Sequence, residues 1–474
     1  MLAKHSAFYF LACGLPGVIN LLGLAIYTRM LSPEAFGAYA LVIAGTGLGN
    51  AVLFQWLQLG VLRFLPGCRD RKGAFLGTIL AVFFCLVVVT CLGGVVALMF
   101  LSDTGMKQLV AVGLVLLWVQ AFFELNKELL RSEFSPRRYG MMAMTKSVVA
   151  LTLGVVFVAL GLEAIGLLFG LVIALGLSMV GQFKREWRQV QLVEADRQLF
   201  RQLAAYGLPL TATFALGFVI SSSDRFFLGW LINAEATGLY AVGYDLANQT
   251  LGMVMMIINL AAYPLAVSAL EREGQAAAER QLSQNAIALL GLGLPSAAGI
   301  ILLAPEISPL FLGQAYQDSA AELMPWIAAA ALLAGLKAYY FDLSFQLGKK
   351  TVLQVWVVLA SALVNVGVNF FLIPIYGIMG SAYATVAAYA VGLILSWVLG
   401  RKVFPLPLPL REFGKIAIAT GIMILPLLAF QALSGPWWLG LKITTAVLVF
   451  GGVSLGINLG GGRDWLLQRR QQGA

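Results

Sequence analysis

Glu34–Ala40 reads Glu-Ala-Phe-Gly-Ala-Tyr-Ala, and Glu235–Ala241, 201 residues further on, reads Glu-Ala-Thr-Gly-Leu-Tyr-Ala. Five of the seven positions match. The triplet Gly-Leu-Pro also precedes each copy, at residues 14–16 and 207–209, inside an apolar run of helical length. The sequence therefore predicts an internal duplication. In membrane transporters two such repeats often surround one substrate site.

The composition is that of a polytopic membrane protein. Hydrophobic residues make up 60% of the 474 residues, charged residues make up 11%, and the mean hydropathy is +0.88. An all-α chain that crosses a bilayer needs apolar runs of about 20 residues. Fourteen such runs are expected, at residues 7–27, 37–60, 74–100, 109–125, 139–160, 164–183, 203–230, 239–269, 286–304, 320–345, 352–375, 377–399, 414–433 and 437–459.

The basic residues are distributed unevenly among the connections between these runs. Alternate connections, together with both ends of the chain, hold 25 of the 31 Lys and Arg residues. Because short cytoplasmic loops retain positive charge, we expect both termini in the cytoplasm and an even number of helices. The net charge of +9 then follows from this topology and from contact with anionic membrane lipids, and nucleic acid is not needed as a partner.

The two motif copies set the expected domain organisation. Each copy joins the first and second helix of a unit, and six helices separate the copies, so the two units enter the membrane in the same direction. This predicts two parallel six-helix bundles, 1–183 and 203–400, with a cytoplasmic linker at 184–202 and two further helices with a cytoplasmic tail at 401–474. The linker is interpreted either as an interfacial amphipathic segment or as a solvated connection only.

Several kinds of chemistry are not expected from this sequence. His5 is the single histidine, and no phosphate-binding Gly-x-x-x-x-Gly-Lys-Ser/Thr sequence occurs. Histidine catalysis, histidine metal sites and ATP hydrolysis of the P-loop kind are therefore excluded. The short outer connections also leave no room for a soluble catalytic domain. We expect a chain that is not an enzyme and that holds no metal and no cofactor.

Polar residues inside the predicted spans are candidates for a substrate cavity, because charge is costly in hydrocarbon. Some lie at helical spacing on residues 239–269 and 352–375, where they either hydrogen-bond neighbouring helices or line a wet cavity. Tyr340 is interpreted either as a sugar-stacking or as a packing residue. The cavity candidates are Lys146, Asp245, Asn248, Gln249, Asn259, Lys337, Tyr340, Asp342, Asn365 and Asn369.

Four charged residues fall at the expected membrane boundaries. Arg29, Asp224 and Arg225 lie near the outer boundary and are gate or anchoring candidates. Arg63 lies near the cytoplasmic boundary, where snorkelling is an adequate explanation. A cavity that holds Lys146 and Lys337 would attract an anion, and phosphate is the anion that lipid carriers bring into a membrane.

The sequence around the first motif copy resembles that of a known family. Residues 29–39 read Arg-Met-Leu-Ser-Pro-Glu-Ala-Phe-Gly-Ala-Tyr, residues 224–229 read Asp-Arg-Phe-Phe-Leu-Gly, and residues 373–377 read Ile-Pro-Ile-Tyr-Gly. These stretches, with Tyr-Pro-Leu at 263–265, resemble the bacterial polysaccharide transporters called Wzx-type oligosaccharide flippases. That family shares its fold with multidrug and toxin extrusion carriers and with the peptidoglycan-precursor lipid flippase.

The resemblance implies a V-shaped, two-bundle transporter in the bacterial inner membrane, which moves an undecaprenyl-diphosphate-linked oligosaccharide from the cytoplasmic to the periplasmic leaflet by alternating access. Such a chain serves O-antigen, capsule or exopolysaccharide biosynthesis. The polysaccharide polymerase and the chain-length machinery are its expected partners. Coupling to a proton or sodium gradient through Asp245 or Asp342, or to the membrane potential, is a hypothesis at this point.

Two other functions remain open from the sequence. A cation-coupled multidrug exporter is expected to have an acidic rather than a basic cavity. A membrane polymerase or ligase for the same lipid-linked sugars is expected to show larger outer loops or a carboxylate cluster.

Overall fold

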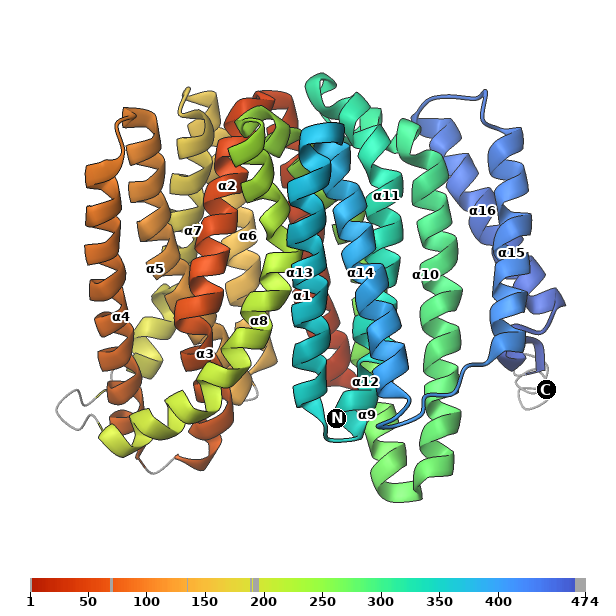
Figure 1. The fold of residues 1–474 in the computed structure, drawn as a ribbon, viewed down its shortest axis with the longest axis horizontal. Helices are drawn as coiled ribbons and strands as arrows, with labels where there is room; N and C mark the ends of the chain where they lie inside the picture. Colours follow the sequence, from red (N-terminus) through yellow and green to blue (C-terminus); the bar gives the residue numbers. More distant parts are fainter. Residues whose placement is uncertain (1, 69–70, 134, 188–189, 191–195, 465–474) are drawn as a thin grey trace. The chain divides into compact units, whose positions relative to one another are not determined.

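The computed structural model describes residues 2–68, 71–133, 135–187, 190 and 196–464, and every regular element in these ranges is a helix (Figure 1). The α-helices are α1 (Leu2–Met30), α2 (Pro33–Gly49), α3 (Gln55–Phe64), α4 (Lys72–Phe100), α5 (Thr104–Ser132), α6 (Pro136–Ala159), α7 (Glu163–Glu186), α8 (Arg197–Leu231), α9 (Ala234–Glu273), α10 (Gln275–Phe311), α11 (Gln317–Leu336), α12 (Leu343–Leu347), α13 (Thr351–Tyr376), α14 (Ile378–Gly400), α15 (Leu410–Ala429) and α16 (Pro436–Gly456). Short π-helical turns, η1 (Asn50–Phe54) and η7 (Lys337–Phe341), and 3₁₀ turns, η2 (Leu65–Gly67), η6 (Gln314–Tyr316) and η8 (Leu459–Gly461), complete the list.

Each of the fourteen expected spans coincides with a helix or with a pair of helices joined by a π-turn. Within the described ranges, thirteen helices are long and apolar enough to cross a membrane, and α1 precedes them with 29 residues. The prediction of an all-helical polytopic membrane protein is therefore confirmed.

The contacts within the chain divide it into two compact units, residues 1–241 and 242–474. Unit 1 holds α1 to α8 and the first residues of α9, and unit 2 begins inside α9 at Val242. From the sequence, by contrast, we expected two bundles that are separated by the linker at 184–202. Of that linker, residues 188–189 and 191–195 lie outside the described residues, as does the expected tail from residue 465.

Helix α8 belongs to unit 1 because it packs along α2 and α3. Two glycines permit this close approach. A Cβ on Gly207 would lie 2.6 Å from the carbonyl oxygen of Trp56, and a Cβ on Gly60 would lie 2.5 Å from a methyl carbon of Leu203. Real Cβ atoms do not come this close to other atoms, so a side chain at position 207 would require a shift of the backbone, and one at position 60 would displace the Leu203 side chain.

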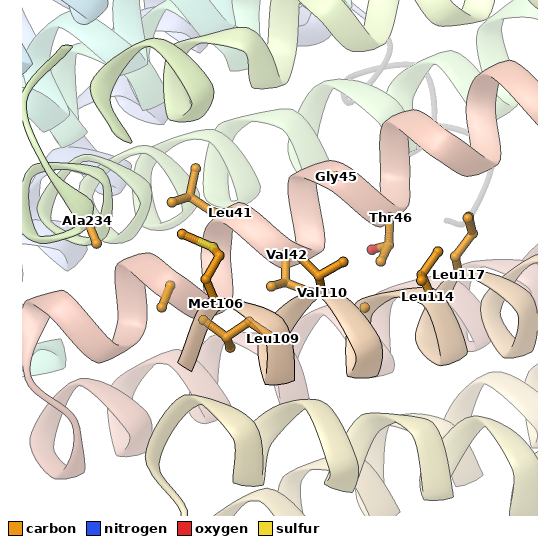
Figure 2. Close-up of a pocket in the computed structure, with 12 residues that line it drawn as sticks. Leu41, Val42, Gly45, Thr46, Met106, Leu109, Val110, Leu114, Leu117 and Ala234 are labelled. Atoms are coloured by element: carbon orange, nitrogen blue, oxygen red, sulfur yellow. The ribbon is translucent and has the colours of Figure 1, made fainter. Parts of the chain in front are cut away.

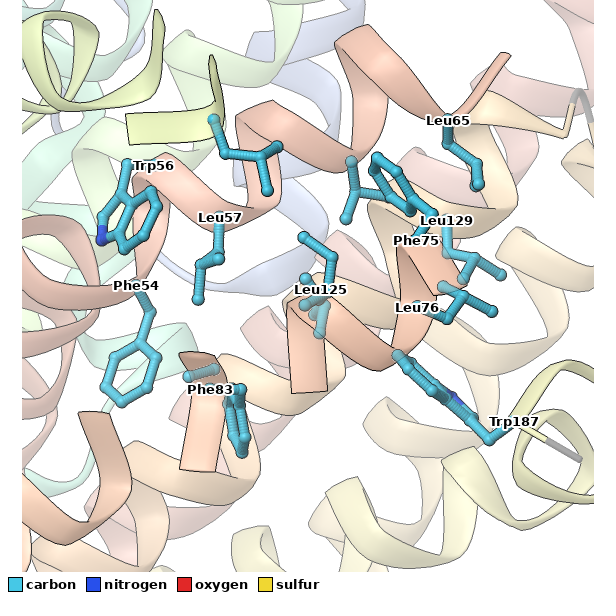
Figure 3. Close-up of a cluster of buried hydrophobic side chains, with 14 of the residues drawn as sticks. Phe54, Trp56, Leu57, Leu65, Phe75, Leu76, Phe83, Leu125, Leu129 and Trp187 are labelled. Atoms are coloured by element: carbon cyan, nitrogen blue, oxygen red, sulfur yellow. The ribbon is translucent and has the colours of Figure 1, made fainter. Parts of the chain in front are cut away.

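A cluster of buried apolar side chains fills unit 1 beside this contact (Figure 3). It joins Phe54 and Leu57 to side chains of α4 and α5, and Trp187 contributes from the end of α7. The Trp187 indole donates a hydrogen bond to the Asn126 side chain at 3.0 Å. Trp187 of the expected linker is thus buried in unit 1, and it fixes the chain where it leaves α7.

Unit 2 is built on the pairs α10 with α11 and α13 with α14, and α15 and α16 form a hairpin beside α10 (Figure 1). Leu303 of α10 packs against Met423 and Leu427 of α15 and against Leu439 and Ala446 of α16. These contacts attach the hairpin to the rest of unit 2 through apolar surface.

Candidate functional site

Two membrane spans contain a π-helical turn, one in each unit. Such turns are rare, and they occur frequently at functional sites because they change which side chains share a face. Both turns hold polar side chains: Asn50 begins η1, and Lys337 begins η7.

In η7 the π-turn creates a buried ion pair. The Asp342 amide donates to the carbonyl oxygen of Lys337 at 2.8 Å, which is the five-residue bond of a π-turn. The Lys337 ammonium lies 2.8 Å from the Asp342 carboxylate. In a regular α-helix, residues five apart point about 140° away from each other. The extra residue in the turn therefore brings these two side chains together.

The Asp342 carboxylate has two further donors in unit 2. Ser396 of α14 donates at 2.6 Å, and Gln354 of α13 donates at 3.3 Å. Lys337 is only 7% exposed and Asp342 only 3% exposed. The structure therefore combines two candidates that the sequence treated separately, and it neutralises the Lys337 charge locally.

Tyr340 lies in the same turn but is occupied by packing. Its hydroxyl donates to the carbonyl oxygen of Pro407, and its ring packs edge-on against Phe341. The side chain is 2% exposed. In this structure Tyr340 connects η7 to the segment between α14 and α15, which favours the packing interpretation over sugar stacking.

The polar stripe on α13 is completely buried. Asn365 and Asn369 are both 0% exposed, as are Ser381 and Thr385 of the adjacent α14. The Asn369 amide donates to the Asn365 side-chain oxygen at 3.2 Å. This bond lies within α13, so it is the complete burial of the stripe that favours packing between helices over a wet surface.

The polar stripe on α9 has a different environment. Asp245, Asn248, Gln249 and Asn259 are all partly exposed. The side-chain carbonyl oxygens of Gln249 and Asn259 are buried, yet they have no hydrogen-bond partner within the described parts of the chain. Buried polar atoms normally have a partner, so this face of α9 suits water or a polar ligand.

In unit 1, Lys146 lies near the middle of α6 and is partly exposed. It has an electrostatic interaction with Glu124. Among the described residues it has no carboxylate within 4 Å, whereas Lys127 pairs with Glu124 at 2.8 Å. Of the two lysines predicted to face a cavity, Lys146 is therefore the one without a close counter-ion.

The boundary candidates fall into two groups. Arg29 and Arg63 are exposed at the ends of α1 and α3, and Arg29 donates to the carbonyl oxygen of Ala25 at 2.5 Å. Asp224 is 0% exposed and accepts a hydrogen bond from the Tyr240 hydroxyl at 2.6 Å. Arg225 is partly exposed beside it. The structure thus places the two arginines at helix ends and Asp224 inside unit 1.

Sequence reasoning missed two buried polar pairs. The Gln58 amide donates to the Asn50 side chain at 2.9 Å across η1, and Gln58 is 2% exposed. In unit 2 the Lys442 ammonium of α16 pairs with the Glu306 carboxylate of α10 and donates to the carbonyl oxygen of Leu433 at 2.8 Å. Lys442 is 0% exposed.

A pocket of about 340 Å³ opens between α2 and α5 (Figure 2). Apolar side chains such as Leu41, Met106 and Leu109 line it, with Thr46 as its one polar side chain. Among the described lining residues none is charged, and none is a predicted cavity residue. This pocket suits a hydrocarbon chain better than a sugar or a phosphate. The described residues also include no group of three or more potential His, Cys, Asp or Glu metal ligands.

Comparison with known proteins agrees with the fold. Residues 26–321 match the family described as "Polysaccharide biosynthesis protein". The "Putative O-antigen transporter" of Shigella flexneri is 21% identical over 416 residues, which cover 84% of this chain and 97% of that protein. This relative is a transporter by name, which favours transport over the polymerase or ligase alternative.

Two solved structures share the fold. The lipid II flippase MurJ in an inward closed conformation superimposes with a TM-score of 0.79 at 14% identity, covering 97% of this chain and 99% of MurJ. An inward-facing multidrug resistance MATE transporter gives 0.64 at 16% identity, covering 83% and 97%. Because the family model matches more than half of the chain, this protein belongs to the family described as "Polysaccharide biosynthesis protein", and its helices are those of a multi-pass membrane protein.

Proposed function

We propose that the protein flips an undecaprenyl-diphosphate-linked oligosaccharide from the cytoplasmic to the periplasmic leaflet of the bacterial inner membrane by alternating access. The observation that carries this proposal is the family match over residues 26–321 together with a fold that covers 97% of the chain in a lipid flippase. The drug-transporter fold covers 83%. The part of this chain that the drug-transporter fold does not cover is about as long as the segment from residue 401 onward.

The α15–α16 hairpin is the part of the chain that suits a lipid tail. A cavity of about 440 Å³ lies between α10 and α16, and Ile287, Leu292 and Phe450 contribute to its lining. Gln284 and Ser454 add two polar groups, and the buried Ser454 hydroxyl has no hydrogen-bond partner within the described residues. A mostly apolar groove with few polar groups can hold a hydrocarbon chain near its polar end.

We assign the diphosphate to Lys146 rather than to Lys337. Lys337 already donates to the Asp342 carboxylate, so an incoming anion would have to compete with a buried counter-ion. Lys146 is partly exposed and has no carboxylate within 4 Å among the described residues. The partner-free oxygens of Gln249 and Asn259 on α9 are our candidates for binding sugar hydroxyl groups.

The direction of transport follows from the proposed topology. With the basic connections and both termini in the cytoplasm, the negatively charged diphosphate moves from the cytoplasmic side to the outside, and the membrane potential does not oppose this movement. A membrane potential that is negative inside assists this movement by about 2.3 kcal/mol per charge per 100 mV. Of the two carboxylates considered for ion coupling, Asp245 is the better candidate, because Asp342 is engaged by three donors in unit 2.

The test is a charge comparison at Lys146. In a deletion strain, Lys146→Gln is expected to abolish most surface polysaccharide and to leave lipid-linked oligosaccharide on the cytoplasmic side, whereas Lys146→Arg retains export. Lys107→Gln is the matched control, because Lys107 is exposed in the first turn of α5. Normal export by Lys146→Gln, at equal protein abundance, would remove Lys146 from the proposal.

A second candidate function is cation-coupled drug export, which the TM-score of 0.64 with a MATE transporter favours. It predicts that a deletion strain becomes sensitive to cationic drugs while its surface polysaccharide is unchanged. The flippase proposal predicts the opposite pair of results.

A further inference from the structure

The two copies of the repeated motif meet each other in the structure. A Cβ built on Gly37 would lie 1.7 Å from the carbonyl oxygen of Ala234 and 2.9 Å from the amide nitrogen of Gly238. A Cβ on Gly238 would lie 2.0 Å from the carbonyl oxygen of Pro33 and 2.9 Å from the amide nitrogen of Gly37. All of these neighbours are backbone atoms, so a rotamer change cannot relieve the contact.

The contact is reciprocal in the register of the duplication. Residues 201 positions apart occupy equivalent places: Pro33 corresponds to Ala234, and Gly37 corresponds to Gly238. Each glycine therefore faces the first-turn carbonyl of the other copy. A carbonyl oxygen placed where Cβ would lie has the geometry of a Cα–H···O contact between closely packed helices.

Both helices begin in the same way, which gives the contact a fixed geometry. The Ser32 hydroxyl accepts a hydrogen bond from the Ala35 amide at 3.2 Å, and the Asn233 side chain accepts one from the Ala236 amide at 2.8 Å. These are N-cap bonds at equivalent positions of the two copies. Each motif copy thus supplies part of the surface that the other copy contacts.

The start of α9 is also held by α8. The Tyr240 hydroxyl donates to Asp224 at 2.6 Å, and the Thr237 hydroxyl donates to the carbonyl oxygen of Arg225 at 3.3 Å. Unit 1 ends at Ala241, and the same helix continues in unit 2 from Val242. The helix that passes from one compact unit to the other is thus clamped to α2 in its first two turns.

We propose that the Gly37–Gly238 contact is a latch that holds the α9 start against α2 and must open during each transport cycle. This inference rests on the proposed alternating-access function. The latch lies on the side opposite the basic connections, which the proposed topology places outside. Its strength depends on backbone contact, so a methyl group at either glycine forces the starts of α2 and α9 apart.

The test uses four alanine variants in the same two helices. Gly37→Ala and Gly238→Ala add a methyl group at the latch. Gly45→Ala in α2 and Gly252→Ala in α9 are matched controls, because a Cβ at either position meets no atom within 4 Å. The reporter is Ala236→Cys, at a residue that is 7% exposed, in a background with the four native cysteines replaced by serine. A membrane-impermeant maleimide is added to right-side-out spheroplasts.

Each latch variant is expected to raise the labelling rate of the reporter about tenfold, since overpacking of about 1.4 kcal/mol changes an equilibrium by that factor. The two controls are expected to label as the parent does. The double variant, Gly37→Ala with Gly238→Ala, should raise the labelling rate by less than the product of the two single-variant factors, because both methyl groups disturb the same helix contact. Parental labelling in both single variants, or full multiplicativity in the double variant, would overturn the latch.

This readout does not depend on the substrate, so it separates the latch from the proposed function. Raised labelling in the latch variants, together with unchanged surface polysaccharide in a deletion strain, would keep the latch and contradict the flippase proposal. If the alanine variants fail to reach the membrane, the labelling rate is measured on the parent reporter protein, which keeps both native glycines. Its reporter is expected to label faster in a host that makes lipid-linked oligosaccharide than in one that does not, and equal rates would refute opening during transport.

Discussion

The buried Lys337–Asp342 pair predicts a strongly unequal set of stability changes. The two side chains are 9% and 4% exposed, and their charged atoms are 2.8 Å apart. Removing one member of a buried ion pair costs about 3–5 kcal/mol, because it leaves an uncompensated charge, whereas replacing both members is far less costly. We therefore expect Lys337→Met and Asp342→Asn each to destabilise the protein, and the double variant to recover much of the loss.

The structure also predicts which single change is worse. In Lys337→Met the Asp342 carboxylate keeps the hydrogen bonds from Ser396 and Gln354, and bonds to a charged group contribute about 1.5–3 kcal/mol each. That variant should lie near 3 kcal/mol. In Asp342→Asn the Lys337 ammonium loses its counter-charge, and the cost should lie near 5 kcal/mol.

The assay is unfolding of the purified protein in dodecylmaltoside with increasing SDS, followed by far-UV circular dichroism. The parent, the two single variants and the double variant can be compared only if their unfolding transitions have equal slopes. A changed slope signals a changed unfolded or native state. Because the double variant is expected to cost less than either single variant, the coupling energy should exceed the roughly 0.5–3 kcal/mol that is usual for contacting residues. Strictly additive single changes, or single changes below about 0.5 kcal/mol, would refute the buried-pair reasoning.

Further predictions concern the polar contacts that the sequence did not reveal. Lys442→Met should destabilise the protein by about 3 kcal/mol by leaving the Glu306 carboxylate without its cation, and adding Glu306→Gln should restore much of it in the same SDS titration. Trp187→Phe should cost about 1 kcal/mol through the lost bond to Asn126, measured in the same way, with larger loss for Trp187→Ala. Gln58→Leu should cost about 1–3 kcal/mol by leaving an unsatisfied buried amide in unit 1, and a neutral result would show that η1 relaxes.

The spans were predictable from the sequence because the bilayer imposes a length and an apolar composition on every helix. Each expected run coincides with a helix, even where a π-turn interrupts it. Reasoning from a period of 3.6 residues cannot foresee a π-turn, however. The sequence therefore listed Lys337 and Asp342 only as separate cavity candidates, and the structure joins them through η7.

Contacts between distant segments were the other limit. Nothing in the local sequence indicates that Glu306 meets Lys442, 136 residues later. The duplicated motif was recognised, but only as the connection between the first and second helix of each unit. The mutual approach of Gly37 and Gly238 became visible only when both copies were placed in space. The cavity and boundary candidates remain proposals, with Lys146 and the α9 face now ahead of Lys337 and Tyr340.

The most direct test of the central proposal is a flipping measurement in proteoliposomes. The purified protein is reconstituted with an undecaprenyl-diphosphate-linked oligosaccharide in both leaflets, and a glycosidase added outside reports how quickly the protected inner pool becomes accessible. We predict fast conversion of the whole pool with the parent protein and slow conversion with Lys146→Gln. If the inner pool stays protected for as long as it does in vesicles without protein, lipid-linked oligosaccharide is not its substrate.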